Sequence, residues 1–184
     1  MISIKILEKE LYDEANNEFI HVSPCAITLE HSLMALSKWE QKWHKPFISK
    51  EEKTYEETMD YIRCMTVTKN VDPNAYYAIS QSDFCRIEEY IKNPSTATWF
   101  SKDSSSSGRS NEIVTAEIIY YWMIAFNIPE SYEKWHLNKL LTLIEVCNRK
   151  NQPPKKISKK EILERNRKLN AERRKKHPTP NKEA

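Results

Sequence analysis

Glycine is almost absent from this chain: its 184 residues contain one, Gly108. Phosphate-cradling loops and dinucleotide-binding turns need several glycines, because the backbone must approach the ligand closely at unusual dihedral angles. The sequence therefore argues against P-loop, Rossmann and kinase-type nucleotide binding. The shortage also argues against a large sheet with many tight hairpins, and it favours helices joined by polar or proline-marked loops.

The patterns that mark secreted and membrane proteins are missing as well. No charged segment followed by an apolar run stands at the start, so no secretory signal is predicted. The longest apolar run, residues 118–126, is far too short to span a bilayer. The four cysteines are widely spaced and form no C-x-x-C pair, which indicates reduced, mostly buried thiols in a cytosolic protein.

Catalytic and metal-binding motifs are not visible either. None of the five histidines stands at metal-ligand spacing from another histidine or a cysteine, so no metal and no cofactor are predicted. Two thiol–imidazole pairs are conceivable, Cys147 with His136 and Cys64 with His31. No local motif supports them, and Cys147 lies on an apolar helical stripe where an inert thiol is expected. We therefore predict that the protein is not an enzyme.

Two carboxylates, Glu30 and Glu117, lie among apolar residues. A carboxylate in such surroundings needs a partner, and a structural ion pair with an arginine or a histidine is expected rather than a catalytic dyad. The Glu-Glu pairs, in contrast, are typical of solvated helix faces; they stand at residues 51–52, 56–57 and 88–89.

Hydrophobic periodicity predicts a mainly α fold: a helical bundle of about five to six helices with a small N-terminal antiparallel β ribbon and a basic C-terminal helical tail. The ribbon is expected from residues 2–7, 19–22 and 26–29. Thr54 and Glu57 have the spacing of a capping box. Helices are expected over residues 30–43, after Thr54, in a short turn after Asp72, after Ser82, and over residues 112–127, 131–148 and 159–176. The segment 112–127 is apolar almost all round, which is typical of a central, buried helix.

Charge divides the chain into two parts, a helical body with its ribbon at residues 1–150 and a basic tail at residues 151–184. From Arg149 onward there are 14 Lys and Arg against 4 Asp and Glu, whereas the preceding residues have 15 against 22. The tail begins with a Pro-Pro linker at residues 152–156, and Ser158 is expected to cap its helix. Such asymmetry predicts a binding partner for the tail, or docking of the tail on its own body.

The basic side chains of the tail are candidates for intermolecular contacts. They can contact phosphates, or they can dock on an acidic protein surface, and a merely solvated helix is the third reading. We favour protein docking slightly, because no motif of a known DNA-binding fold is visible. The candidates are Lys159, Lys160, Arg165, Arg167, Lys168, Arg173, Arg174, Lys175 and Lys176.

A resemblance covers nearly the whole chain from Leu29 to about Arg174. The segments that carry it are LEHSL at 29–33, LSKWE at 36–40, WHKPF at 43–47, DYIRCMT at 60–66, TATWF at 96–100, TAEIIYYWMI at 115–124, WHLNKLL at 135–141 and PPKK at 153–156. Together they resemble a family of proteins encoded by tailed bacteriophages and prophages within the tail-morphogenesis gene block. Its members are similar to tail assembly chaperones.

The resemblance implies a function without chemistry. A tape-measure protein is long and helical and exposes apolar surface before the tail tube encloses it, so its chaperone needs grooves that receive amphipathic helices. The implied partners are phage tail proteins, either the tape measure or the tail tube, and an oligomer is compatible with this role. The implied location is the host cytoplasm, with the virion as an alternative.

Aromatic residues are the candidates for lining such a groove, although for any one tryptophan a place in the core is the competing interpretation. The candidates are Trp39, Trp43, His44, Trp99, Phe100 and Trp135. Two other functions compete with the chaperone. One is a nucleic-acid-binding protein that acts through the basic tail, and the other is a structural virion subunit such as a tail-completion or connector protein.

Overall fold

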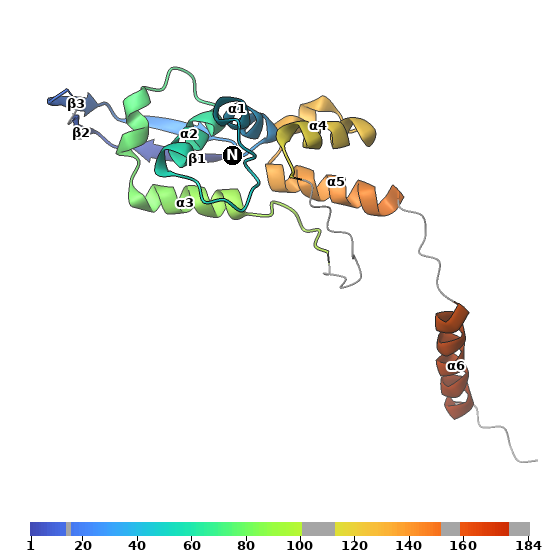
Figure 1. The fold of residues 1–184 in the computed structure, drawn as a ribbon. Helices are drawn as coiled ribbons and strands as arrows, with labels where there is room; N and C mark the ends of the chain where they lie inside the picture. Colours follow the sequence, from blue (N-terminus) through green and yellow to red (C-terminus); the bar gives the residue numbers. More distant parts are fainter. Residues whose placement is uncertain (14–15, 101–112, 152–158, 177–184) are drawn as a thin grey trace, which may run out of the picture. The chain divides into compact units, whose positions relative to one another are not determined.

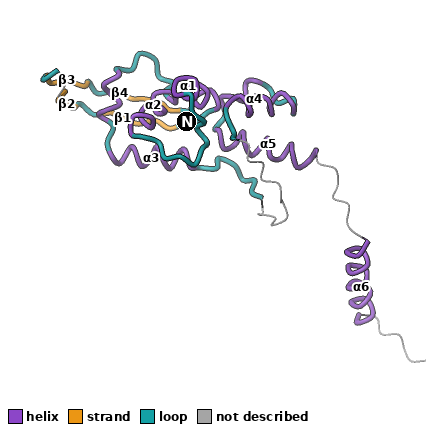
Figure 2. Tube along the Cα trace, in the orientation of Figure 1, coloured by secondary structure: helices purple, strands orange, loops and turns teal. Residues whose placement is uncertain are grey.

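The structure is a computed structural model that describes residues 1–13, 16–100, 113–151 and 159–176. The chain divides into two compact units, Met1–Arg149 and Lys150–Ala184. Helices dominate the described residues, and strands are confined to the N-terminal part of the chain (Figures 1 and 2). The predicted mainly α fold with a small antiparallel ribbon is thus confirmed. The linker predicted at residues 152–156 and the cap predicted at Ser158 lie outside the described residues.

The strands form two antiparallel pairs rather than the single ribbon that we expected. Strand β1 pairs with β4, and β2 pairs with β3. The unpredicted strand is β2, whose sequence KELYD alternates only weakly and leaves most side chains in water. The strand bounds are β1 (Ile2–Ile6), β2 (Lys9–Asp13), β3 (Glu18–Val22) and β4 (Cys25–Leu29).

Short-range signals set most of the helix boundaries. The Thr54–Glu57 capping box is confirmed at the start of α2, and Asp72 caps the predicted short turn, η1. Ser32 caps α1, which begins at Leu33, three residues after the start of the predicted segment. Ser80 rather than Ser82 caps α3. The helices are α1 (Leu33–Trp43), α2 (Tyr55–Met65), η1 (Pro73–Ala78), α3 (Gln81–Lys92), α4 (Ala116–Ala125), η2 (Glu130–Lys134), α5 (Leu137–Asn151) and α6 (Lys159–Lys176).

The helix predicted over residues 131–148 is divided in the structure. The short helix η2 ends at Lys134, and α5 begins only at Leu137. Between them the backbone is extended, and His136 forms an isolated bridge with Ser32 while the Leu137 N–H donates to the His31 carbonyl oxygen at 2.8 Å. The break therefore follows from the pairing of residues 136–137 with residues 31–32 at the start of α1. Hydrophobic periodicity within the segment cannot predict such a long-range contact.

Two hydrophobic clusters form the interior of the first unit. The first packs β1 and β4 against α1, α2, η1 and α3, with Trp39 and Ile62 among its buried residues. The second packs another side of α1, through Leu33 and Leu36, against α4 and α5. Helix α1 contributes to both clusters, and Figure 1 shows it between the strands and the α4–α5 pair.

Candidate functional site

Helix α4 is not the buried central helix that its composition predicts. Ala116, Ile119 and Met123 are buried against α1 and α5, but the opposite face is open to solvent. On that open face Tyr121 is 67% exposed and Ile124 is 76% exposed. A surface helix normally carries polar residues on its outer face. The two large apolar side chains make this face a candidate binding surface, and the exposed Glu117 lies one turn before Tyr121 on the same side.

A shallow groove lies between α4 and α5, on another side of α4, and neither Tyr121 nor Ile124 lines it. Its walls are mainly apolar, with one carboxylate and one amide at the α5 side, and its volume is about 350 Å³. The lining residues, which define the α4–α5 groove, are Trp122, Phe126, Leu141, Ile144, Glu145 and Asn148. Grooves with apolar walls and a few polar groups are typical of sites that bind amphipathic helices or small apolar ligands.

Charged residues continue the α5 side of the groove. Glu145 accepts a hydrogen bond from Arg149 Nε at 2.6 Å. The guanidinium carbon of Arg149 lies 4.1 Å from the ring centroid of Phe100. Phe100 is thereby held beside the last turns of α5, whereas the neighbouring Trp99 is 81% exposed.

A single buried carboxylate from α1 supports the start of α4. The two oxygens of Glu40 accept hydrogen bonds from the Phe47 N–H and the Ala116 N–H, each at 2.7 Å. Thr115 is the N-cap residue of α4 but makes no side-chain cap, so Glu40 takes over that role. A negative charge at a helix N-terminus is favourable, because the free N–H groups there carry partial positive charge. Glu40 therefore fixes the position of the helix that carries the open apolar face.

The predicted groove residues of α1 do not meet on one surface. Trp39 is 1% exposed, and its indole N–H donates to the Glu57 carbonyl oxygen at 2.8 Å, so it is a core residue and not a binding residue. Trp43 is half-buried, and His44 is exposed with a left-handed φ of 52° that ends α1. The expectation of a Trp39–Trp43–His44 binding surface is therefore wrong for Trp39, because its ring stacks on Trp43 at 6.2 Å between centroids and is buried in the first cluster, against which Trp43 also packs.

The other predicted aromatic residues are also separated. Trp135 stacks on Tyr132 at 3.9 Å between ring centroids and lies under the Lys139 ammonium at 4.1 Å. Phe100 contacts Arg149, which lies ten residues after Lys139 on α5, a distance of roughly 15 Å along the helix. Trp135 and Phe100 thus lie at different ends of α5 and cannot line one small pocket. The sequence interpretation did not single out Trp122 and Phe126, although both lie in the segment 112–127 that is apolar almost all round.

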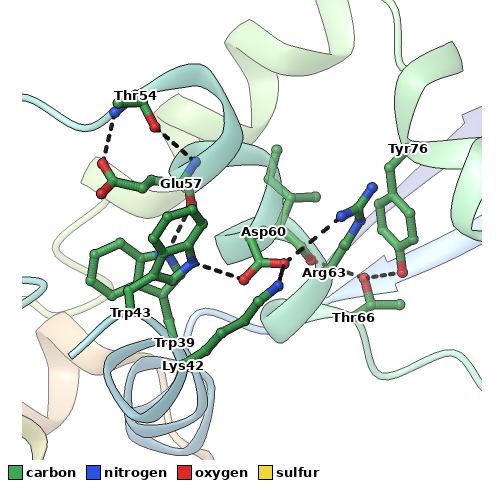
Figure 3. Close-up of polar contacts among 10 residues, drawn as sticks. Trp39, Lys42, Trp43, Thr54, Glu57, Asp60, Arg63, Thr66 and Tyr76 are labelled. Carbon is green, nitrogen blue, oxygen red and sulfur yellow. Dashed lines mark hydrogen bonds and ion pairs between the residues drawn. The ribbon is translucent and has the colours of Figure 1, made fainter. Parts of the chain in front are cut away.

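Two buried carboxylates of α2 are tied into a polar network (Figure 3). Asp60 accepts hydrogen bonds from Lys42 Nζ at 2.6 Å and from the Trp43 indole N–H at 2.9 Å. Glu57 closes the capping box and pairs with Lys45 at 2.7 Å. Hydrogen bonds from Lys45 and from the Thr54 N–H lower the pKa of Glu57. All of these groups are partnered, so the network ties α1 to α2.

This network corrects the prediction for the acidic residues. Glu57 belongs to a Glu-Glu pair that we expected on a solvated face, yet it is 3% exposed. Glu117, which we expected to need a buried partner, is exposed, and Glu30 is half-buried. Which carboxylate is buried depends on which helix packs against it, and the local sequence does not contain that information.

Histidines and tyrosines form a second buried polar group, at the junction of the two clusters. His31 Nδ1 lies 2.6 Å from the Tyr61 hydroxyl, and the His31 and His136 rings meet at 5.0 Å. His136 Nε2 lies 3.0 Å from the Tyr90 carbonyl oxygen. Burial, and next the neighbouring His136, lower the pKa of His31 to about 3. His31 is therefore neutral at ordinary pH.

The thiol–imidazole pairs considered from the sequence gain no support from these contacts. The His31 ring contacts Tyr61 and His136. Burial, together with the nearby Asp60, raises the pKa of the Cys64 thiol to about 11, which keeps it protonated and weakly reactive. Within residues 1–13, 16–100, 113–151 and 159–176, no group of three or more His, Cys, Asp or Glu side chains is placed to hold a metal ion. No helix in this part of the chain is long and apolar enough to cross a membrane.

Comparison with known proteins adds no further assignment. Neither protein-family models, nor curated proteins, nor solved structures give a match to this chain. The open face of α4, the α4–α5 groove and the charged helix α6 are therefore the features from which a function is inferred.

Proposed function

We propose that this protein is a non-enzymatic binding protein that receives an amphipathic helix of a partner on the open face of α4. The observation that supports this class is the outer face of α4, where the large apolar side chains of Tyr121 and Ile124 are mostly exposed. An amphipathic helix covers such a face with residues spaced three and four apart, and removing that area from water favours binding.

Within this class we propose a tail assembly chaperone-like factor of phage tail morphogenesis, whose partner is the tape-measure protein. The resemblance of the segments TAEIIYYWMI and WHLNKLL to the phage family supports this assignment, because these segments supply α4 and the start of α5. Before the tail tube encloses it, a tape-measure protein exposes helices of the required kind. The protein then acts in the host cytoplasm and needs no cofactor.

Co-purification with the tape-measure protein tests the proposal. The full chain should capture tape-measure fragments, and replacing Tyr121→Gln and Ile124→Gln should reduce capture at least tenfold. Tyr55→Gln with Val67→Gln is the matched control, because these residues are 64% and 52% exposed but lie on and after α2. Equal capture by both double variants would exclude the open face of α4 as the binding surface, and capture of tail-tube protein instead would replace the proposed partner.

Mass spectrometry of purified virions distinguishes the chaperone from a structural subunit. A chaperone leaves the particle once the tail is built, so its peptides should be absent from virions and present in infected-cell lysate. Peptides at a stoichiometry similar to that of tail proteins would instead identify a virion subunit.

A further inference from the structure

Helix α6 carries a charged surface that has no part in the proposed binding of a partner by α4. The unit Lys150–Ala184 contains 13 Lys and Arg against 4 Asp and Glu, whereas Met1–Arg149 contains 16 against 22. All side chains described on α6, from residue 162 to residue 173, are exposed. The charged side chains between residues 162 and 173 are therefore available to a ligand in solution.

Charges are not spread evenly around α6. Glu164, Lys168 and Glu172 follow one another at intervals of four residues and so lie on one line of the helix. Arg165 and Leu169 lie beside them on the same side. Positive charges on this side have carboxylates as neighbours, which reduces their attraction for an outside anion.

The opposite side of α6 is poorer in carboxylates: Arg173 has none three or four positions away, and Arg167 has one, Glu164, whereas Lys168 has two. Asn166, Asn170 and Arg173 are spaced four and three residues apart, and Arg167 lies one turn before Asn170, so helical periodicity places the four on one face. We call these four residues the basic face. Guanidinium groups are donors only and match the geometry of phosphate oxygens, while asparagine amides both donate and accept.

A protein groove is a poor match for this helix. The apolar residues Ile162, Leu163 and Leu169 are 44%, 67% and 42% exposed. None of the three has another large apolar residue three or four positions further along the helix. Docking of a helix in an apolar groove needs such a stripe, and α6 lacks it.

We infer that the basic face of α6 binds double-stranded DNA, with Arg167 and Arg173 on phosphates and the helix in the major groove. An α-helix is about 10–12 Å wide and fits the major groove, which is about 12 Å wide in B-DNA. Asn166 and Asn170 face the base edges in this arrangement. Single strands are bound mainly by stacking on aromatic residues, and residues 150–184 contain no Phe, Tyr or Trp.

The acidic first unit limits where this binding occurs. Met1–Arg149 has more carboxylates than basic residues, so it repels a phosphate backbone. Binding is thus expected to depend on α6 alone and to be unaffected by the open-face variants Tyr121→Gln and Ile124→Gln. This inference does not rest on the proposed chaperone role.

Fluorescence anisotropy of a labelled 20-base-pair duplex, with the full-length protein and increasing salt, tests the inference. The affinity should fall linearly with the logarithm of the salt concentration. The double variant with Arg167→Gln and Arg173→Gln should bind about tenfold or more weaker at low salt and should show a slope smaller by about 2. Glutamine keeps the helix propensity close to that of arginine, and circular dichroism checks that helix content is unchanged.

A matched variant removes the same charge from the other side of α6. Arg165→Gln with Lys168→Gln should weaken binding much less than the first pair, because these residues stand beside carboxylates. Equal losses from the two pairs would overturn the basic face, and no duplex binding at 50 mM salt would overturn the inference as a whole. Equal affinity for a single strand, or displacement by polyglutamate as readily as by duplex DNA, would also overturn it.

Discussion

The two hydrophobic clusters of the first unit differ in how completely the chain covers them. In the first cluster, strands and helices enclose Trp39, Ile62 and Ile87, each at most 2% exposed. In the second cluster, α4 buries one face and leaves Tyr121 and Ile124 in water. Helix α4 is the more apolar segment and yet the less covered one, so composition does not distinguish an enclosed helix from a partly exposed helix. The difference lies in how many elements pack around each helix.

Replacing one tryptophan in each region should give the largest difference in the free energy of unfolding between the two regions. Trp39→Ala should lower the free energy of unfolding by about 3–5 kcal/mol, because it empties a closed site and removes the hydrogen bond to Glu57. Trp122→Ala should cost less than half as much, because this side chain is only partly buried. Urea unfolding measures both values. A loss at Trp122 that equals the loss at Trp39 would show that the second cluster is equally closed.

Replacing Glu40 should cause the next largest loss in the free energy of unfolding, because its carboxylate connects the two regions. Glu40→Ala leaves two amide groups without their acceptor, and we expect a loss of about 2–3 kcal/mol. Hydrogen exchange should speed up first in α4, since Ala116 loses its cap. Glu40→Gln retains one acceptor oxygen and is the matched control, with an intermediate loss. Unchanged exchange in α4 would contradict the cap.

Acid should weaken the junction between the regions. The folded-state pKa of His31 is about 3, while an unfolded histidine titrates near 6.5. The unfolded state therefore binds more protons between these values, and stability should fall as the pH is lowered from 6.5, by at most about 1.4 kcal/mol per pH unit. His31→Gln should flatten this dependence between pH 7 and pH 5. An equally steep dependence in the variant would rule out His31 as its source.

The open face of α4 should give the smallest effect on stability. Tyr121→Gln with Ile124→Gln should change the free energy of unfolding by no more than about 0.5 kcal/mol per site, because the side chains are already in water. Thermal unfolding measures this, beside the capture experiment in which the same variant should fail. A large loss of stability would mean that the face is covered in the free protein.

Much of the secondary structure was predictable, while the candidate groove was predictable only in part. The capping box at Thr54 and the final helix at residues 159–176 correspond to observed elements, because they depend on residues a few positions apart. The apolar segment over residues 112–127 correctly indicated a helix but wrongly indicated full burial. Trp39 and Trp43 are four residues apart on α1, and this spacing did not distinguish the buried Trp39 from the half-buried Trp43.

The sequence by itself determined the mainly helical fold, the starts of α2, η1 and α6, and the separation of an acidic body from a basic tail, since caps, periodicity and charge are local or additive properties. Only the tertiary structure decided that Glu40 caps a helix 76 positions away, that Glu57 and Asp60 are buried, and that α4 keeps an apolar face in water. These outcomes depend on which elements pack together. That choice is made by long-range contacts whose partners are far apart in the chain.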